Sequence, residues 1–227
     1  MERKEFIKRL GLTTLVVPIV AVHHNSEAKI DAEDCIDSPR ETAGPFPTKN
    51  PNNLLTSDIR SDRSGIGMTV EITIQNRNDK CGALAGALVD IWHCDKDGYY
   101  SEYGGSGMQP VDLQALHFLR GRQKTDADGR AIFTSIFPGW YRGRAPHIHV
   151  QIFSETGKSL LVTQIAFPTE VCDNVYTKAT QHYTRGKQDT SNESDGVFAN
   201  SLNNQMGIIT GSIAKGFVLR DTIVVSA

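Results

Sequence analysis

The sequence predicts an all-β fold, a β-sandwich that carries an extended N-terminal arm and few short helices. Two observations support this prediction. From residue 67 onward the chain contains many short runs rich in β-branched and aromatic residues, and Gly, Pro, Asn and Asp turn signals separate these runs. Residues 29–66 are instead rich in Asp, Ser, Pro, Asn and Gly and lack periodicity, which is typical of an arm that wraps a core formed later in the chain. The sandwich domain is therefore expected over residues 67–227.

Residues 1–28 are predicted to be an export signal peptide. A basic start is followed by an apolar run that ends at Val22 and is too short for a convincing membrane span. The start is similar to a twin-arginine signal, with Arg3-Lys4 in place of the usual arginine pair. We expect a periplasmic or secreted protein that begins between Val22 and Ile30. A frayed amphipathic N-terminus is the alternative.

The composition is that of one soluble globular domain. The chain has 227 residues, a hydrophobic content of 39% and a formal net charge of -2, which leaves room for one sizeable core. Acidic and basic residues are interspersed, which argues against nucleic acid or an anionic membrane as the main partner. A small-molecule substrate fits better, and the oligomeric state stays open.

The predicted strands follow one another from the end of the arm to the C-terminus. They are "MTVEITIQN" (68–76), "ALAGALVDIWHC" (83–94), "AIFTSIFP" (131–138), "PHIHVQIF" (146–153), "LLVTQIAF" (160–167) and "GFVLRDTIVVSA" (216–227). The stretch "DADG" at 126–129 predicts a turn with Gly129 at a positive φ. A short helix is expected in "PTEVCDNVYTKAT", with Thr169 as its cap.

Four cysteines, at positions 35, 81, 94 and 172, bear on the redox compartment. An exported chain can form disulfides, because the compartments outside the cytosol are oxidising. The spacing does not reveal the pairing, and buried free thiols are an open alternative. A metal site built from these cysteines is not expected, because no C-x-x-C spacing occurs.

The His-x-His pair in "PHIHVQIF" is the first sign of a metal site. Alternate residues of a strand share a face, so His147 and His149 lie on the same side. Ile148, Val150 and Ile152 then face the core. Two imidazoles at this spacing can bind one metal ion.

Tyrosines are the candidates for the remaining ligands. They are Tyr141, just before the strand, and Tyr99, Tyr100 and Tyr103 in "GYYSEY". A trivalent cation can remove the proton of a phenol, and the resulting tyrosinate is a hard anionic ligand that suits Fe(III). Glu155 lies too far along the strand to complete a two-histidine, one-carboxylate site. His93 and His117 are interpreted as structural, hydrogen-bonded histidines.

Four segments, taken together, carry a resemblance to a known family. They are "TAGPFP" (42–47), "VDIWHCDKDGYYSEY" (89–103), "FLRGRQKTDADG" (118–129) and "PGWYRGRAPHIH" (138–149). In this order they resemble the intradiol ring-cleaving dioxygenases, the family of protocatechuate 3,4-dioxygenase and catechol 1,2-dioxygenase. The chain is similar to the compact, protocatechuate-type subunit of that family.

The resemblance implies a mononuclear, non-haem Fe(III) site with two tyrosinate and two histidine ligands. These ligands fall on Tyr100, Tyr141, His147 and His149. It further implies that Arg144 stabilises charge on the bound substrate, that Gln164 acts on the bound oxygen, and that Trp92 lines the pocket. Tyr141 would be the tyrosinate that substrate displaces.

The expected activity is cleavage of a catechol ring between its two hydroxylated carbons, with O2, to a muconate-type product. Two alternatives stay open at this point. One is a cupin-like metalloenzyme, although its second histidine motif is not found. The other is a non-catalytic, transthyretin-like binding module that kept the sandwich and lost the metal.

Overall fold

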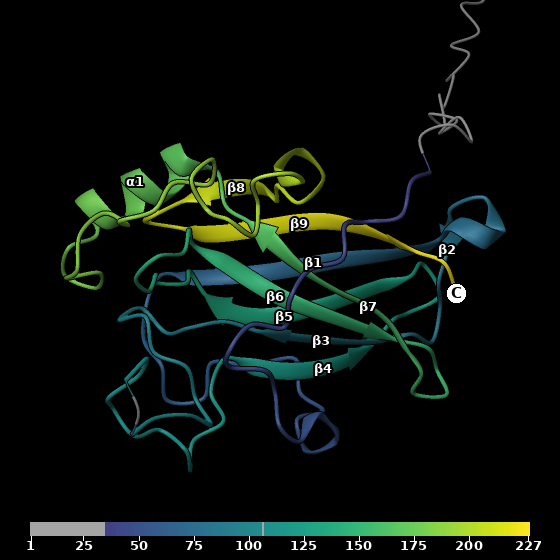
Figure 1. Cartoon of the computed structure of the whole chain (residues 1–227), viewed down its shortest axis with the longest axis horizontal. Helices are drawn as coiled ribbons and strands as arrows, with labels where there is room; N and C mark the ends of the chain where they lie inside the picture. Colours follow the sequence, from purple (N-terminus) through teal and green to yellow (C-terminus); the bar gives the residue numbers. More distant parts are fainter. Residues whose placement is uncertain (1–34, 106) are drawn as a thin grey trace, which may run out of the picture. The chain divides into compact units, whose positions relative to one another are not determined.

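A computed structural model describes residues 35–105 and 107–227 of the chain (Figure 1). Within these ranges the protein forms two β-sheets that pack face to face, with one α-helix, which confirms the predicted β-sandwich. The predicted signal peptide, residues 1–28, lies outside the described residues. No helix in the described part of the chain is long and apolar enough to cross a membrane.

One of the two sheets, called the first sheet below, contains the first and the last strand of the sandwich domain. Its strand order is β2-β1-β9-β8, and β5 pairs with β1 beside β2. The first and last long strands, β1 and β9, pair in parallel, and the other neighbours are antiparallel. The bounds are β1 Gly67–Asn76, β2 Gly82–Ala83, β5 Arg130–Ile136, β8 Ile208–Ser212 and β9 Gly216–Val225.

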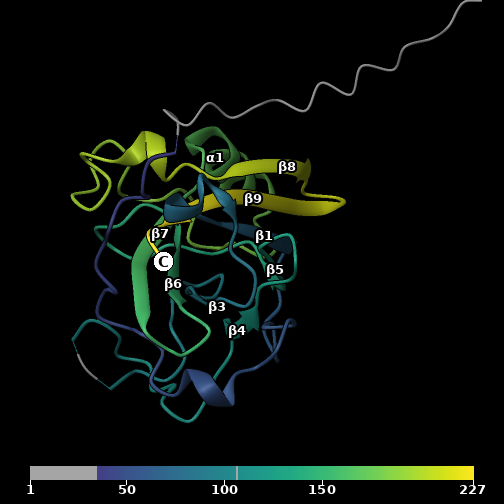
Figure 2. The same ribbon diagram turned by 90° about the vertical axis from the view of Figure 1, so that its right-hand side faces the viewer.

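The other sheet carries the His-x-His pair. Its strands are antiparallel in the order β4-β3-β6-β7, and the view in Figure 2 shows them as a separate layer beside the strands of the first sheet. The bounds are β3 Leu88–Trp92, β4 Arg120–Lys124, β6 His147–Phe153 and β7 Ser159–Ala166. In the rest of this article it is called the histidine sheet.

The core fills the space between the two sheets. Ile148, Val150 and Ile152 of β6 are fully buried there, together with Val70 and Ile72 of β1. This confirms the alternation predicted for β6. The two histidines of β6 therefore point to the outer face of the histidine sheet. They are nevertheless buried, because loops and the arm cover that face.

Three strands were not predicted as separate elements: the two-residue β2, β4 and β8. The sequence "RGRQK" of β4 is polar, yet Arg120 and Arg122 are buried. The Arg122 guanidinium donates to both carboxylate oxygens of Asp90 on β3, so the charge of this strand is neutralised by a neighbour that local sequence does not reveal. Strand β8 is short and largely exposed. It forms a hairpin with β9 and lacks the alternation that would have identified it.

The predicted helix is present as α1, Thr169–Lys178. The prediction that Thr169 caps it is wrong, because Thr169 is the first helical residue and Pro168 occupies the N-cap position without a side-chain cap. The predicted turn at 126–129 is present, and Gly129 has a φ of +73°. Three short 3-10 helices complete the described elements: η1 Pro51–Asn53, η2 Arg77–Asp79 and η3 Leu202–Asn204.

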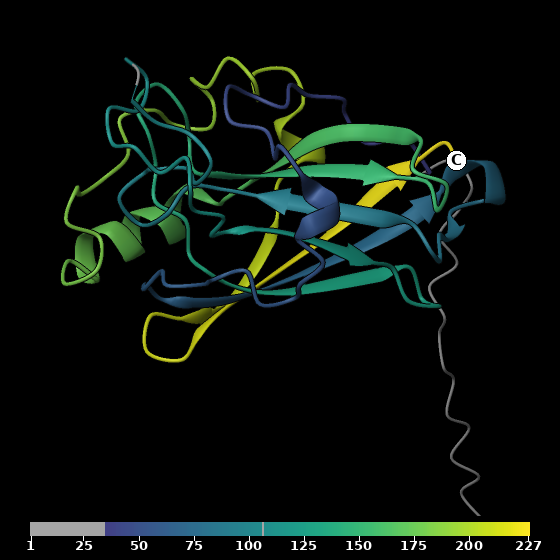
Figure 3. The ribbon, with the colours of Figure 1, turned by 90° about the horizontal axis from the view of Figure 1, so that it is seen from below.

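The described part of the arm runs across the outer face of the histidine sheet (Figure 3). The Glu41 amide donates to the carbonyl of Val162 on β7, at 2.8 Å. Farther along, Leu55 forms an isolated bridge with Arg122 of β4, beyond η1. The arm thus passes from one edge of the sheet to the other, directly above the strand that bears the histidines.

A disulfide joins Cys35, at the start of the described arm, to Cys81, before β2. The remaining cysteines, Cys94 and Cys172, are buried thiols. The pairing that the sequence left open is therefore settled by the fold.

Cys81→Ser is expected to lower the free energy of unfolding by about 2–4 kcal/mol, because the cross-link closes a long loop and restricts the unfolded chain. The sequence separation of the two cysteines is 46. Urea denaturation with and without reductant checks this. Reductant should bring the parent down to the level of the variant and leave the variant unchanged, whereas equal stability of both oxidised proteins would contradict the expectation.

Candidate metal centre

The four predicted ligands meet in one cluster at the outer face of the histidine sheet. His147 and His149 come from β6, Tyr141 from the loop before β6, and Tyr100 from the loop after β3. The Nε2 atoms of the two histidines are 3.1 Å apart, and Tyr100 Oη lies 3.4 Å from Nε2 of His147. The Tyr141 ring centroid is 5.7 Å from those of both Tyr100 and His147. Four side chains from three chain segments thus face one small volume.

The hydrogen bonds of His147 determine which ring nitrogen is free. Its Nδ1 lies 2.6 Å from the carbonyl oxygen of Ala145, which can only accept. Nδ1 therefore carries the proton, and Nε2 presents its lone pair to the cluster. The Nε2 atom of His149 faces the same point. Two nitrogen lone pairs this close repel each other unless a cation lies between them or one nitrogen carries a proton.

The two imidazoles are neutral in this environment. Burial, with a smaller contribution from the Arg144 charge, lowers the pKa of His147 to about 3. Burial, followed by the effect of neighbouring His147, lowers the pKa of His149 well below its usual value. Since a metal binds the neutral form of histidine, burial keeps both side chains ready to act as ligands at neutral pH.

The two phenols behave in the opposite way. Burial raises the pKa of Tyr100 well above 10, and it also raises the pKa of Tyr141, against the opposing charge of Arg144. Neither phenol ionises at neutral pH without help. A bound cation can remove these protons, and the resulting set of two anionic oxygens and two neutral nitrogens fits a hard trivalent ion.

Tyrosines are required for a complete ligand set here. Among the described residues, no group of three or more His, Cys, Asp and Glu side chains is arranged to hold a metal ion. Glu155, the carboxylate considered from the sequence, is exposed and pairs with Lys124. The residues that could hold a metal at this place are therefore the two histidines and the two tyrosines.

Strand register places the neighbours of His149. Trp92 of β3 and Gln164 of β7 are its cross-strand partners on either side. The Trp92 ring stacks on the imidazole with a centroid distance of 4.8 Å and an interplanar angle of 2°. Trp92 thus fixes the ring plane of His149 as well as lining the cluster.

Arg144 joins the cluster through a turn. Its amide donates to the carbonyl of Tyr141, which brings the guanidinium back towards that tyrosine. One terminal nitrogen lies 3.4 Å from Tyr141 Oη, and the other donates to Gln164 Oε1 at 2.6 Å. The Gln164 amide nitrogen donates to the carbonyl of Thr42 in the arm. Arg144, Gln164 and Tyr141 are thereby connected.

Two residues of the "TAGPFP" segment, Phe46 and Gly44, cover the cluster. Phe46 stacks on Tyr100 with a centroid distance of 4.8 Å. Gly44 has a φ of +68°, and a Cβ atom added there would lie 3.0 Å from Cε1 and 3.3 Å from Nε2 of His149. The arm is therefore part of the cluster, and glycine allows it to pass close to His149, a predicted ligand.

Gly44→Ala is expected to push the arm away from His149 and to weaken metal binding, in addition to a backbone cost of about 1–3 kcal/mol from the positive φ. Gly157→Ala is a matched control, because Gly157 has a φ of +86° and open space around its Cβ position. Metal titration of both variants separates the two effects. Equal metal affinity in the two variants would show that the arm does not touch the centre.

Gln109 supports Tyr100 and was not predicted. Its buried side-chain amide accepts from the Tyr100 backbone nitrogen and donates to the Tyr100 carbonyl, both at 2.7 Å. Gln109 lies in a loop without periodicity, so no signal in the sequence identifies it. The Tyr100 backbone is held from both sides by this one residue.

Tyr103, His93 and His117, which the sequence interpretation left out of the ligand set, have structural partners. Tyr103 Oη donates to the carbonyl of Pro47. His93 is buried between the Cys94 carbonyl and the Ser135 hydroxyl, and burial lowers its pKa to about 4. His117 pairs with Glu102. These residues lie where the sequence interpretation put them, outside the ligand cluster.

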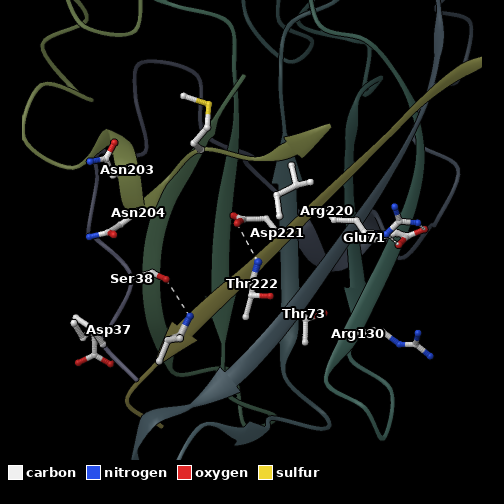
Figure 4. A pocket seen from close by; sticks show the side chains of 14 residues that line it. Asp37, Ser38, Glu71, Thr73, Arg130, Asn203, Asn204, Arg220, Asp221 and Thr222 are labelled. Carbon is white, nitrogen blue, oxygen red and sulfur yellow. Dashed lines mark hydrogen bonds and ion pairs between the residues drawn. The ribbon is translucent and has the colours of Figure 1, made fainter. Parts of the chain in front are cut away.

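A separate groove of about 680 Å³ lies at the first sheet, between the start of the described arm, β1, β9 and the loop before β8 (Figure 4). Its side chains include Asp221, whose pKa burial raises to about 7, and the exposed ion pair of Arg220 with Glu71. None of the predicted site residues lines it. Its size alone does not make it the reactive centre.

Comparison with known proteins identifies the family of this chain. A family model described as "Dioxygenase" matches residues 37–203. Catechol 1,2-dioxygenase 1 of Acinetobacter lwoffii is 24% identical over 176 residues, covering 66% of this chain and 54% of the relative. The protocatechuate 3,4-dioxygenase beta chain of Burkholderia cepacia is 30% identical over 121 residues, covering 50% and 51%. The chain thus spans about half the length of these relatives.

Among solved structures, an intradiol ring-cleavage dioxygenase from Tetranychus urticae superimposes with a TM-score of 0.74 and 28% identity. The superposition covers 85% of this chain and 95% of that one. The match of the family model extends from the arm through the loops that contain Tyr100 and Tyr141 and through β6 to the segment after α1. The chain therefore belongs to the intradiol ring-cleavage dioxygenase family.

Proposed function

We propose that this protein is a non-haem Fe(III) dioxygenase that cleaves a catechol-type ring between its two hydroxylated carbons. The convergence of Tyr100, Tyr141, His147 and His149 in one buried cluster carries this proposal. Relatives named for catechol and protocatechuate support a catechol as substrate. Both oxygen atoms of O2 enter the product, a muconate-type dicarboxylic acid.

A bound ferric ion would be held by these four side chains and would supply Lewis-acid chemistry that activates the catechol ring towards O2. The protein contributes proton transfer and charge stabilisation. Tyr141 is less buried than Tyr100 and contacts Arg144, so its phenolic oxygen is the better placed of the two to accept a proton from a substrate hydroxyl.

Arg144 is proposed to stabilise the negative charge of the bound substrate during ring attack. Its guanidinium keeps its charge throughout and lies beside Tyr141, where a substrate oxygen would arrive. Both polar groups of the Gln164 amide are engaged, one by Arg144 and one by Thr42. Gln164 is therefore proposed to act through Arg144 in this arrangement.

Iron analysis, a visible spectrum and oxygen uptake test the proposal together. Purified protein should contain about one iron per chain and show a tyrosinate-to-iron charge-transfer band. It should consume one O2 per catechol or protocatechuate ring and form a muconate-type product. Family membership removes the cupin-like alternative. A binding module remains the alternative outcome and would contain no iron and leave every catechol intact.

We also propose that the protein is exported. The basic and apolar start of the sequence supports this, as does the disulfide between Cys35 and Cys81, which favours an oxidising compartment. N-terminal sequencing of the mature protein from expressing cells is the test. A start between Val22 and Ile30 is expected, and a mature chain that retains Met1 would contradict export by a cleaved signal.

A further inference from the structure

We propose that Asp195 positions Arg144 for the ring-cleaving reaction. Asp195 lies in the segment between α1 and β8, far along the chain from Arg144, and does not itself contact the ligand cluster. This inference rests on the proposed function. Asp195 is a buried carboxylate outside the proposed metal centre. Its proposed role is to hold the positive charge of Arg144 beside that centre.

The environment of Asp195 is built around its charge. The residue is fully buried, and both carboxylate oxygens accept from Arg144 Nε, at 2.8 and 3.0 Å. The amides of Ala145 and Val197 add hydrogen bonds of 2.8 and 2.9 Å. Among the described residues, Arg144 is the only cation paired with this carboxylate. A buried charge with one counter-ion holds that counter-ion firmly.

Holding the Nε edge fixes the direction of the rest of the guanidinium. The group is planar, so fixing Nε at Asp195 also fixes the plane in which the two terminal nitrogens donate. One reaches Gln164 Oε1 and the other reaches Tyr141 Oη. The Phe198 ring packs against the guanidinium with a centroid distance of 5.6 Å and limits its rotation.

The same carboxylate also supports the start of β6. It accepts a hydrogen bond from the amide of Ala145. The Ala145 carbonyl in turn accepts a hydrogen bond from Nδ1 of His147. One residue thus links the position of Arg144 to the orientation of a proposed ligand. The effect of Asp195 on Arg144 can be measured separately, because Arg144 can be replaced in the same protein.

A purely structural ion pair is the competing explanation, and the chain offers a matched control for it. Asp90 and Arg122 form a second buried pair on the histidine sheet, also with two charge-assisted hydrogen bonds. Neither residue contacts the ligand cluster. Asp90→Asn therefore measures what loss of such a pair does to stability without affecting Arg144.

In the iron-loaded protein, Asp195→Asn is expected to lower kcat by about tenfold or more, because a loosened Arg144 stabilises the transition state less. KM, iron content and the visible band should change little. Asp90→Asn should keep the kcat of the parent. A kcat for Asp195→Asn within about twofold of that of the Asp90→Asn control would overturn the proposal.

A double-mutant cycle with Arg144→Ala tests whether Asp195 acts through Arg144. Once Arg144 is absent, Asp195→Asn should lower kcat no further. If the double variant instead lost kcat by the product of the two single-variant factors, the proposal would be overturned. If Asp195→Asn does not fold, Arg144→Lys serves instead, since it keeps the charge but loses the planar grip on the carboxylate. It should lose kcat as Arg144→Ala does, and normal turnover would again overturn the proposal.

A measurement on the metal-free protein is independent of turnover. In urea unfolding, the effects of Asp195→Asn and Arg144→Ala should be non-additive, whereas Asp195→Asn and Asp90→Asn should add. Additivity within the first pair would show that the two side chains do not interact.

A parent protein without ring-cleaving activity would remove the proposed function and this role together. An active parent with a normal Asp195→Asn variant would remove this role alone.

Discussion

His149→Ala is expected to lose most of the iron and, with it, the visible colour and the ring-cleaving activity. The Nε2 atom of His149 lies 3.1 Å from that of His147, so both nitrogens face the same proposed metal position. Loss of an outer hydrogen-bond partner already weakens metal binding about 10- to 100-fold in other sites. Loss of the ligand itself removes a bond to the metal and should weaken binding by more than about 100-fold.

The measurement is iron content after dialysis against a weak chelator, with the visible spectrum and kcat on the same sample. His117→Ala is the control, because His117 is largely exposed and pairs with Glu102 away from the cluster. It should retain iron, colour and turnover. Since Trp92 stacks on His149, the stability of both variants must be compared as well. A folded His149→Ala variant with full iron content would contradict the ligand assignment.

Arg144→Ala is expected to lower kcat by about 100-fold or more while iron and colour persist. Its guanidinium is placed beside Tyr141 and does not belong to the ligand set. Removal of a group that stabilises transition-state charge typically costs about 100- to 1,000-fold in kcat. The effect should appear in kcat more than in KM, because the charge develops during the reaction.

Arg142→Ala is the matched control for Arg144→Ala. Arg142 belongs to the same loop but is exposed. Replacing Arg144 also leaves the buried Asp195 without its cation, so the variant is expected to be less stable and should be assayed well below its unfolding temperature. Steady-state kinetics on iron-replete protein gives the answer. A kcat within a few-fold of the parent would remove Arg144 from the mechanism.

Local patterns were sufficient to predict most strands and one feature of the site. The alternation in β6 follows from backbone geometry, so it placed Ile148 and Val150 in the core and His147 and His149 on the other face. The same reasoning failed for β4, because a strand whose arginines are neutralised by a partner strand has no apolar alternation. It also misplaced the cap of α1, where Pro168 rather than Thr169 stands at the N-cap.

Assembly of the site depends on contacts between distant segments. The ligand types were identified by motif, but the motif does not show that Gly44 passes over His149 or that Gln109 clamps Tyr100. These residues lie in loops, whose sequences lack a repeating pattern that would reveal their neighbours.

The amino-acid sequence was enough to establish the β-sandwich class, the shared face of the histidine pair and, through resemblance, the four candidate ligands. Each depends on a local regularity: the two-residue repeat of a strand, or a short motif. The fold was needed to pair Cys35 with Cys81 and to bring Asp195 to Arg144. Such pairings depend on which strands become neighbours and in which register, and many registers are compatible with the same local pattern until burial of the whole core selects one.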